Sequence, residues 1–169
     1  MTEEGYPTYL GVTCPKCQST DWEVTGQRGS GLRAVSGGIG ATVTAVKNAY
    51  STKEQEKPLK AKCHQCKKRF PVQPVIATAE ETLSAPAELE LTREKHFAGS
   101  ASANWILING QIVTPIRNGE TLLVQVWTRH IYLQLLDVVG QASAQYERFT
   151  VEPGEHYERA LKIKPRWIL

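Results

Sequence analysis

The two pairs of cysteines constrain this chain more than any other feature of its sequence. All four cysteines of the chain lie in two C-x-x-C pairs. A gap of two residues lets one tight turn direct both sulfurs of a pair towards one point, and two such turns can enclose a tetrahedral metal site. We therefore predict one structural zinc ion, bound by Cys14, Cys17, Cys63 and Cys66.

The closed ligand set predicts that the metal stabilises the fold rather than catalyses a reaction. Four thiolates leave no coordination position for water or a substrate, and metal binding then contributes to the free energy of folding. A redox-active pair would lie at the start of a helix in a βαβ unit, and no such pattern surrounds either pair. An iron centre with four thiolates is the alternative metal site. His64, inside the second pair, is expected to face solvent.

Short strand-like segments flank both cysteine pairs. Asp21–Thr25 follows the first pair, Leu59–Lys62 leads into the second and Arg69–Val72 leaves it. This layout resembles the zinc ribbon family over residues 10–73. Zinc ribbons often carry glycine directly after each pair, where a left-handed backbone is convenient. Gln18 and Lys67 occupy those positions here, so we expect modest backbone strain there.

The gap between the pairs is much longer than in a compact zinc ribbon. It spans residues 18–62, a length of 45 residues, against roughly 15–20 in the compact pattern. We predict an insertion over residues 26–57. Its small residues recur four positions apart, as they do on helix faces that allow close approach of another helix. These candidate contact residues are Gly37, Ala41, Ala45 and Ala49.

Three alternatives stay open for this Gly/Ala-rich insertion: a loop with a short helix, a helix that binds a partner or a second copy, and a segment that dips into a membrane. The uncharged run over residues 34–46 would form about 20 Å of helix, too short to cross a hydrocarbon core of about 30 Å. The chain is similar to bacterial zinc ribbon proteins with a hydrophobic hairpin between the pairs, in a shortened and more polar form.

Basic residues gather around the second cysteine pair. Zinc ribbons of transcription and translation proteins use similar basic edges against phosphate groups, which makes nucleic-acid binding the alternative function. The competing explanation is a solvated strand edge whose lysines discourage pairing with other strands. The candidate contacts are Lys60, Lys62, Lys67, Lys68 and Arg69.

The second half of the chain has the pattern of an all-β domain. After a linker over residues 74–87, rich in Ala, Thr, Glu and Pro, alternating runs are separated by turn sequences. Asn109-Gly110 and Asn118-Gly119 are dipeptides typical of hairpin turns. Residues 88–169 are therefore predicted to form an antiparallel β-sandwich of about seven strands. With the zinc ribbon over residues 1–73, the fold class is mainly β.

Several motifs of this half resemble uncharacterised bacterial β-sandwich domains related to carbohydrate-binding-like and surface-associated modules. The resemblance covers roughly residues 87–164 and implies a fold but no activity. The motifs are Arg93, Phe97-Ala98-Gly99-Ser100-Ala101, Ile106-Leu107-Ile108-Asn109-Gly110, Ile116-Arg117-Asn118-Gly119-Glu120 and Pro153-Gly154-Glu155-His156.

No catalytic constellation, nucleotide-binding loop or small-molecule substrate is indicated by the sequence. A net charge of +3 is too small to identify a nucleic-acid binder. The acidic start of the sequence, without a secretory pattern, predicts a cytoplasmic protein, with membrane association as a further expectation. We predict a non-enzymatic, zinc-binding assembly or adaptor protein. Its partner is another protein or a second copy of the chain, with a membrane surface or nucleic acid as alternatives.

Overall fold

The computed structural model describes residues 5–26, 46–48, 59–95, 103–137, 142–143 and 146–163. Within these ranges every regular element is a β-strand, and the strands form four sheets. None of the described residues belongs to a helix with the length and apolar character needed to cross a membrane. The mainly β fold class predicted from the sequence is confirmed.

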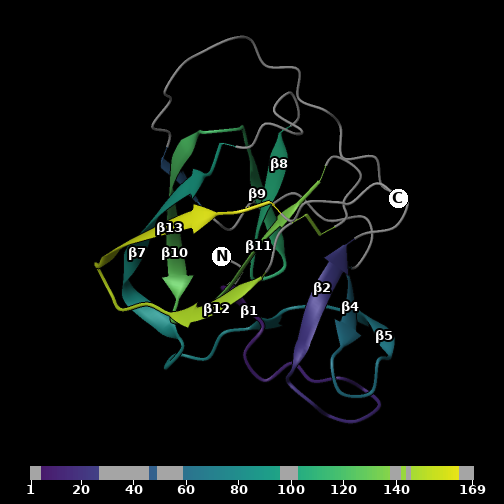
Figure 1. Cartoon of the computed structure of the whole chain (residues 1–169). Helices are drawn as coiled ribbons and strands as arrows, with labels where there is room; N and C mark the ends of the chain where they lie inside the picture. The colour runs from purple at the N-terminus through teal and green to yellow at the C-terminus, as the bar shows by residue number, and fades with distance from the viewer. Residues whose placement is uncertain are drawn as a thin grey trace, which may run out of the picture.

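Two four-stranded sheets pack face to face as a sandwich (Figure 1). The first has the strand order β13-β7-β10-β3, with bounds His156–Leu161, Thr82–Arg93, Thr121–Thr128 and Val46–Asn48. The second has the order β12-β11-β8-β9, with bounds Glu147–Thr150, His130–Leu136, Asn104–Ile108 and Gln111–Ile116. All these strands except β3 lie after residue 81 of the chain.

Alternate residues of the long strands fill the space between the two sheets. In β7, Leu89 and Leu91 are fully buried there, whereas Glu88 and Glu90 lie on the opposite face. Successive side chains of a strand point to opposite faces of its sheet, so this alternation is the physical basis of the sandwich core.

Turn residues join the strands as their backbone preferences require. Asn109 and Gly110 have φ values of 47° and 81° and connect β8 to β9, which pair as an antiparallel hairpin. This hairpin was predicted from the Asn-Gly dipeptide. Gly119, with φ 74°, also lies in a turn, but β9 and β10 on either side of it belong to different sheets. The second dipeptide therefore carries the chain from one sheet to the other.

Strand pairing differs from the sequence expectation in two respects. β13 runs parallel to β7, and β3 runs parallel to β10, within a sandwich that is otherwise antiparallel. The stretch expected to be a linker also contains strands, because β6 covers Val75–Ile76 and β7 already begins at Thr82. Leu83 and Ala87 of this stretch are buried in the sandwich core, so the first half of β7 packs as part of the sheet.

A three-stranded antiparallel sheet carries both cysteine pairs. It has the order β2-β4-β5, with bounds Trp22–Gly26, Leu59–Cys63 and Arg69–Val72. We call these strands, with the two cysteine turns, the ribbon. Next to it, β1 (Pro7–Thr8) pairs with β6, which follows the ribbon in sequence.

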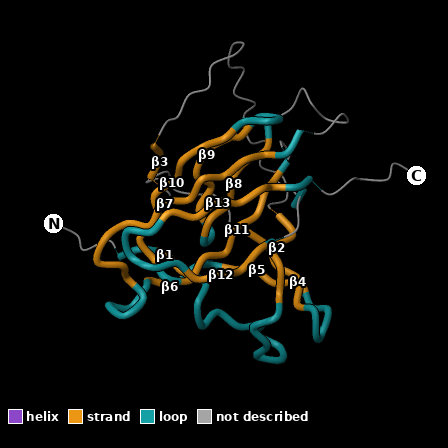
Figure 2. The backbone as a smooth tube through the Cα atoms, turned by 60° about the vertical axis from the view of Figure 1, so that its left-hand side comes forward, coloured by secondary structure: helices purple, strands orange, loops and turns teal. Residues whose placement is uncertain are grey.

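The ribbon forms a third layer on the sandwich. Figure 2 shows β2, β4 and β5 beside the sheet that contains β11 and β12. In β11, Leu133 and Leu135 face the sandwich core, whereas Tyr132 and Leu136 pack against the ribbon together with Leu107 of β8. The sheet β12-β11-β8-β9 is thus covered on both faces, which explains the nearly continuous apolar sequence of β8 and β11.

A network of buried hydrogen bonds joins the ribbon to the sandwich. Val24 donates its backbone N–H to Tyr132 Oη over 2.8 Å, and its carbonyl accepts a bond of 3.1 Å from Gln134 Nε2. Tyr132 Oη in turn donates to Gln134 Oε1 over 2.9 Å. The free edge of β2 is therefore satisfied by side chains of β11, because buried backbone groups without partners are costly.

The predicted insertion lies mostly outside the described residues. Of residues 26–57, the structure describes Gly26 at the end of β2 and the three residues of β3. The candidate contact residues Gly37, Ala41, Ala45 and Ala49 all lie outside the described ranges. The three alternatives for this segment remain predictions.

Candidate metal centre

The two cysteine turns have the same backbone geometry. Cys14 N–H donates to Ser19 O over 2.9 Å, and Cys63 N–H donates to Lys68 O over 2.9 Å. The residues directly after the pairs, Gln18 and Lys67, have φ values of 58° and 60°. A left-handed backbone is the conformation that the sequence predicts at these positions, and the structure confirms it. Each turn therefore holds two sulfurs on one side of its backbone.

The four sulfurs lie at the distances expected around one metal ion. Sγ of Cys14 is 3.6 Å from Sγ of Cys66, and Sγ of Cys17 is 3.5 Å from Sγ of Cys63. All four sulfurs are within 4.8 Å of one another, and none belongs to a disulfide. A tetrahedron with metal–sulfur bonds of about 2.3 Å has sulfur–sulfur edges of about 3.8 Å. The predicted set of four ligands is therefore brought together as a metal site.

The crowded sulfurs perturb one another's ionisation. Burial raises the pKa of Cys14, but backbone hydrogen bonds from Cys17 and Lys16 outweigh it and bring the value to about 6. At Cys17, a backbone hydrogen bond from Ser19 lowers the pKa, whereas burial and the neighbouring thiols raise it to about 11 overall. Adjacent thiols cannot all ionise unless a cation balances their charge. A divalent metal ion would supply that charge.

The metal site is part of the hydrophobic contact between ribbon and sandwich. Cys14 and Cys63 are fully buried in the cluster that also contains Trp22 and Tyr132, whereas Cys17 is exposed. The indole of Trp22 is completely buried and stacks on Tyr132 with ring centroids 5.8 Å apart. Metal ligation and domain packing thus share the same residues, and four thiolates leave no open position for chemistry.

His64 is no ligand of this site. Its Nδ1 lies 2.7 Å from Asp21 Oδ1, and its Nε2 lies 3.6 Å from Glu23 Oε1. The side chain is half-buried at the edge of the ribbon, more enclosed than the solvent-facing position expected from the sequence. These contacts connect the second cysteine turn to the start of β2.

The predicted basic residues lie on or next to the outer face of the ribbon. Lys60, Lys67, Lys68 and Arg69 are exposed and Lys62 is half-buried. Lys62 is the cross-strand neighbour of both Glu23 and Arg69. Lys67 donates from Nζ to His64 O over 2.6 Å. The face is therefore mainly basic, and the acidic Glu23 lies among its basic residues.

Arg148, which links the sandwich to the ribbon, was not predicted from the sequence. It projects from β12, donates from Nη2 to Trp22 O over 2.9 Å and lies over the Trp22 ring at 4.5 Å. It also lies 5.3 Å from the ring centroid of Tyr132 and 5.7 Å from that of Tyr146. No local motif announces this stacking, because the aromatic partners come from distant parts of the chain.

No family model matches this chain, and no curated protein or solved structure matches it. The evidence for the four clustered cysteines and for the β-rich fold therefore comes from the structure alone. The resemblances to zinc ribbons and to bacterial β-sandwich domains remain predictions from sequence motifs.

Proposed function

We propose that this protein is a non-enzymatic adaptor in which one structural zinc ion closes the ribbon that packs on the β-sandwich. The observation that carries the proposal is the place of Cys14 and Cys63 in the cluster between ribbon and sandwich. Zinc suits four thiolates in a tetrahedral arrangement, and such closed sites stabilise folds. In this proposal the metal maintains the architecture, and surfaces elsewhere bind the partner.

Exposed apolar residues support a binding role. Among the described residues, the large hydrophobic side chains that are exposed are Leu10 at 45%, Val75 at 47% and Ile76 at 64%. They come from neighbouring segments, because β6 pairs with β1 and Leu10 lies two residues after the end of β1. Contiguous apolar residues on a surface often mark a site of protein contact. The small residues of the insertion remain a second candidate contact.

Metal analysis and reconstitution test the zinc part of the proposal. We expect about one zinc ion per chain, and replacement by Co²⁺ should give the thiolate charge-transfer bands of a four-sulfur site. Cys17→Ser alters the exposed ligand and should weaken metal binding without removing a buried side chain. A protein that folds with unchanged stability after complete chelation would contradict a structural metal.

Sedimentation velocity at several protein concentrations tests the adaptor part, together with flotation on liposomes and reconstitution with a purified candidate partner. We expect self-association or a stoichiometric complex with the partner. We propose that the complex forms in the cytoplasm, with the membrane surface as a further candidate site. A strictly monomeric protein that forms no complex and does not float with liposomes would contradict it.

Nucleic-acid binding remains the second candidate, supported by the exposure of Lys60, Lys68 and Arg69 on the ribbon. Binding through these residues would neutralise phosphates and release counterions, so affinity should fall steeply with salt. Titration of single- and double-stranded DNA and RNA at 50 and 200 mM salt tests it. Absence of binding at about 50 mM salt removes this candidate.

A further inference from the structure

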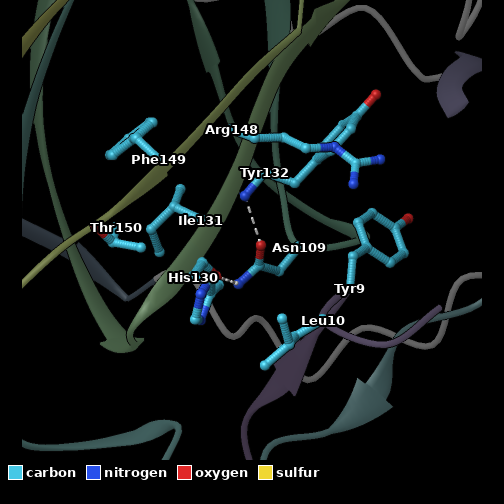
Figure 3. Close-up of a pocket in the computed structure, with 9 residues that line it drawn as sticks. All are labelled: Tyr9, Leu10, Asn109, His130, Ile131, Tyr132, Arg148, Phe149 and Thr150. Carbon is cyan, nitrogen blue, oxygen red and sulfur yellow. Dashed lines mark hydrogen bonds between the residues drawn. The ribbon is translucent and has the colours of Figure 1, made fainter. Parts of the chain in front are cut away.

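A pocket lies between the outer face of the sandwich and the loop that leads to the first cysteine turn (Figure 3). Its volume is about 200 Å³. Tyr9 and Leu10 form one wall, and Thr150 with neighbouring residues of β11 and β12 forms the other. Asn109 lies at its base, where its side chain donates to His130 O over 3.1 Å and accepts from Tyr132 N–H over 2.8 Å.

The base and walls of this pocket are firmly built. Asn109 is fully buried, and its Nδ2 also donates to Thr128 Oγ1 over 2.9 Å. Tyr9 is 5% exposed and packs edge-on against both Trp22 and Tyr132, with ring centroids 5.0 and 5.3 Å apart. The wall made by Tyr9 is thus fixed to the cluster that contains the metal site. A preformed apolar cavity with few polar groups is the usual form of a binding site.

The two basic residues that line the pocket, His130 and Arg148, differ in their partners. His130 has its Nδ1 2.7 Å from Oε1 of Glu81, which is almost completely buried. Arg148 is exposed and forms no ion pair with any described residue; its contacts are three aromatic rings and one carbonyl. A guanidinium on aromatic rings keeps several N–H donors for a carboxylate. Arg148 is therefore a cation beside an apolar cavity with no carboxylate partner among the described residues.

The apolar surface continues beyond the pocket. Leu10 belongs both to the pocket wall and to the exposed group that includes Val75 and Ile76. A ligand of about 200 Å³ would fill the cavity but would leave β6 uncovered. A polypeptide segment can occupy the pocket with one side chain and cover β6 with the next residues.

We propose that this pocket binds a segment of a partner protein that places one apolar side chain in the cavity and an adjacent carboxylate on Arg148. The inference rests on the adaptor function proposed above and specifies the partner chemistry for it. Charge complementarity selects an acidic segment over a basic one, because a lysine next to Arg148 would be repelled.

Short peptides test this assignment with zinc-loaded full-length protein. The probes are blocked peptides of sequence Gly-Leu-Asp-Leu-Gly, the same peptide with Lys in place of Asp, and the same peptide with Ala in place of both Leu. Amide chemical shifts, followed by NMR during titration, report binding at Leu10, His130 and Thr150. We expect saturable binding of the first peptide and at least tenfold weaker binding of the other two.

Single substitutions distinguish a loss of peptide binding at the pocket from a general loss of folding. Thr150→Trp fills the cavity from an exposed position and should weaken binding at least tenfold. Arg148→Gln should do the same, whereas Arg129→Gln, which alters a nearby arginine already paired with Glu152, should leave binding unchanged. Arg148→Gln can also destabilise the ribbon, because Arg148 contacts Trp22. Thr150→Trp leaves that contact intact and therefore tests the pocket independently.

Several results would overturn the assignment. These are equal affinity for the aspartate and lysine peptides, no saturable binding of any probe, or unchanged binding by Thr150→Trp. Equally tight binding of free hexanoate would assign the pocket to a small acid instead of a peptide. If the peptides fail while the protein still forms a stoichiometric complex with a partner, the pocket assignment falls and the adaptor function stands.

Discussion

Removal of one hydroxyl group should show how strongly the buried hydrogen bonds between ribbon and sandwich stabilise the protein. Tyr132→Phe keeps the ring that stacks on Trp22 but deletes the oxygen that accepts from Val24 N–H and donates to Gln134 Oε1. Two buried polar groups then lose a partner, each at a cost of about 1–3 kcal/mol. Because Gln134 has further interactions, we expect the free energy of unfolding to fall by about 2–4 kcal/mol.

Urea denaturation of the zinc-loaded protein measures this loss, followed both by tryptophan fluorescence and by far-ultraviolet circular dichroism. The matched control is Tyr157→Phe, which deletes a hydroxyl that is bonded to Glu155 and to the Glu152 backbone in an exposed turn. Surface changes of this kind usually alter stability by less than about 0.5 kcal/mol. Equal stability losses in the two variants would refute the argument, because the buried network would then contribute nothing.

Three further predictions concern the turns and one surface histidine. Asn109→Ala should lower the free energy of unfolding by about 3–5 kcal/mol, since four side-chain hydrogen bonds are lost, two of them buried, and alanine disfavours positive φ. Asn109→Gly, without that strain, should lose less in the same urea assay. Gln18→Gly should raise the midpoint of thermal unfolding, whereas Gln65→Gly should lower it, because glycine relieves strain only at the position with positive φ. A side-chain hydrogen bond to Glu88 raises the pKa of His156. The stability that His156 contributes should therefore be complete below pH about 6.5 and be lost as pH rises through the higher folded-state value. The difference in free energy of unfolding between the wild-type protein and His156→Gln should shrink over that range, and a difference that does not change with pH would contradict the assignment.

The cysteine site could be predicted from the sequence because each pair of ligands is marked by a short motif. Two C-x-x-C pairs define four sulfur ligands, and the residues after each pair mark the two left-handed positions at Gln18 and Lys67. The hairpin at Asn109-Gly110 was accessible for the same reason, since one dipeptide determines the turn.

The contact between ribbon and sandwich was not accessible, because its partners are far apart in sequence. Val24 and Tyr132 are separated by 108 positions, and neither residue type implies the other. One hint was available in the apolar run of β11, where Tyr132, Leu133, Leu135 and Leu136 break the alternation of a strand with one solvated face. Parallel pairing of β13 with β7 likewise follows from the overall topology and not from the residues of either strand.

The pocket was missed for a related reason. Its walls combine the loop at Tyr9 with β11 and β12, which only tertiary structure brings together. The sequence instead favoured the insertion as the contact site, because its periodic pattern of small residues is visible locally. Local patterns favour features that repeat along the chain over surfaces assembled from separate segments.

The long separation between the two sides of the ribbon contact has a consequence for synthesis on the ribosome. Both cysteine pairs have been made once Cys66 is added, so a metal ion can close the ribbon at that point. Arg148, which covers Trp22, follows 82 residues later, an interval of roughly 4–16 s at 5–20 residues per second. During that time the aromatic face of the ribbon has no sandwich to pack against. A nascent chain of this protein therefore exposes the apolar face of the ribbon during this interval, and we expect general chaperones that shield apolar surface to associate with it.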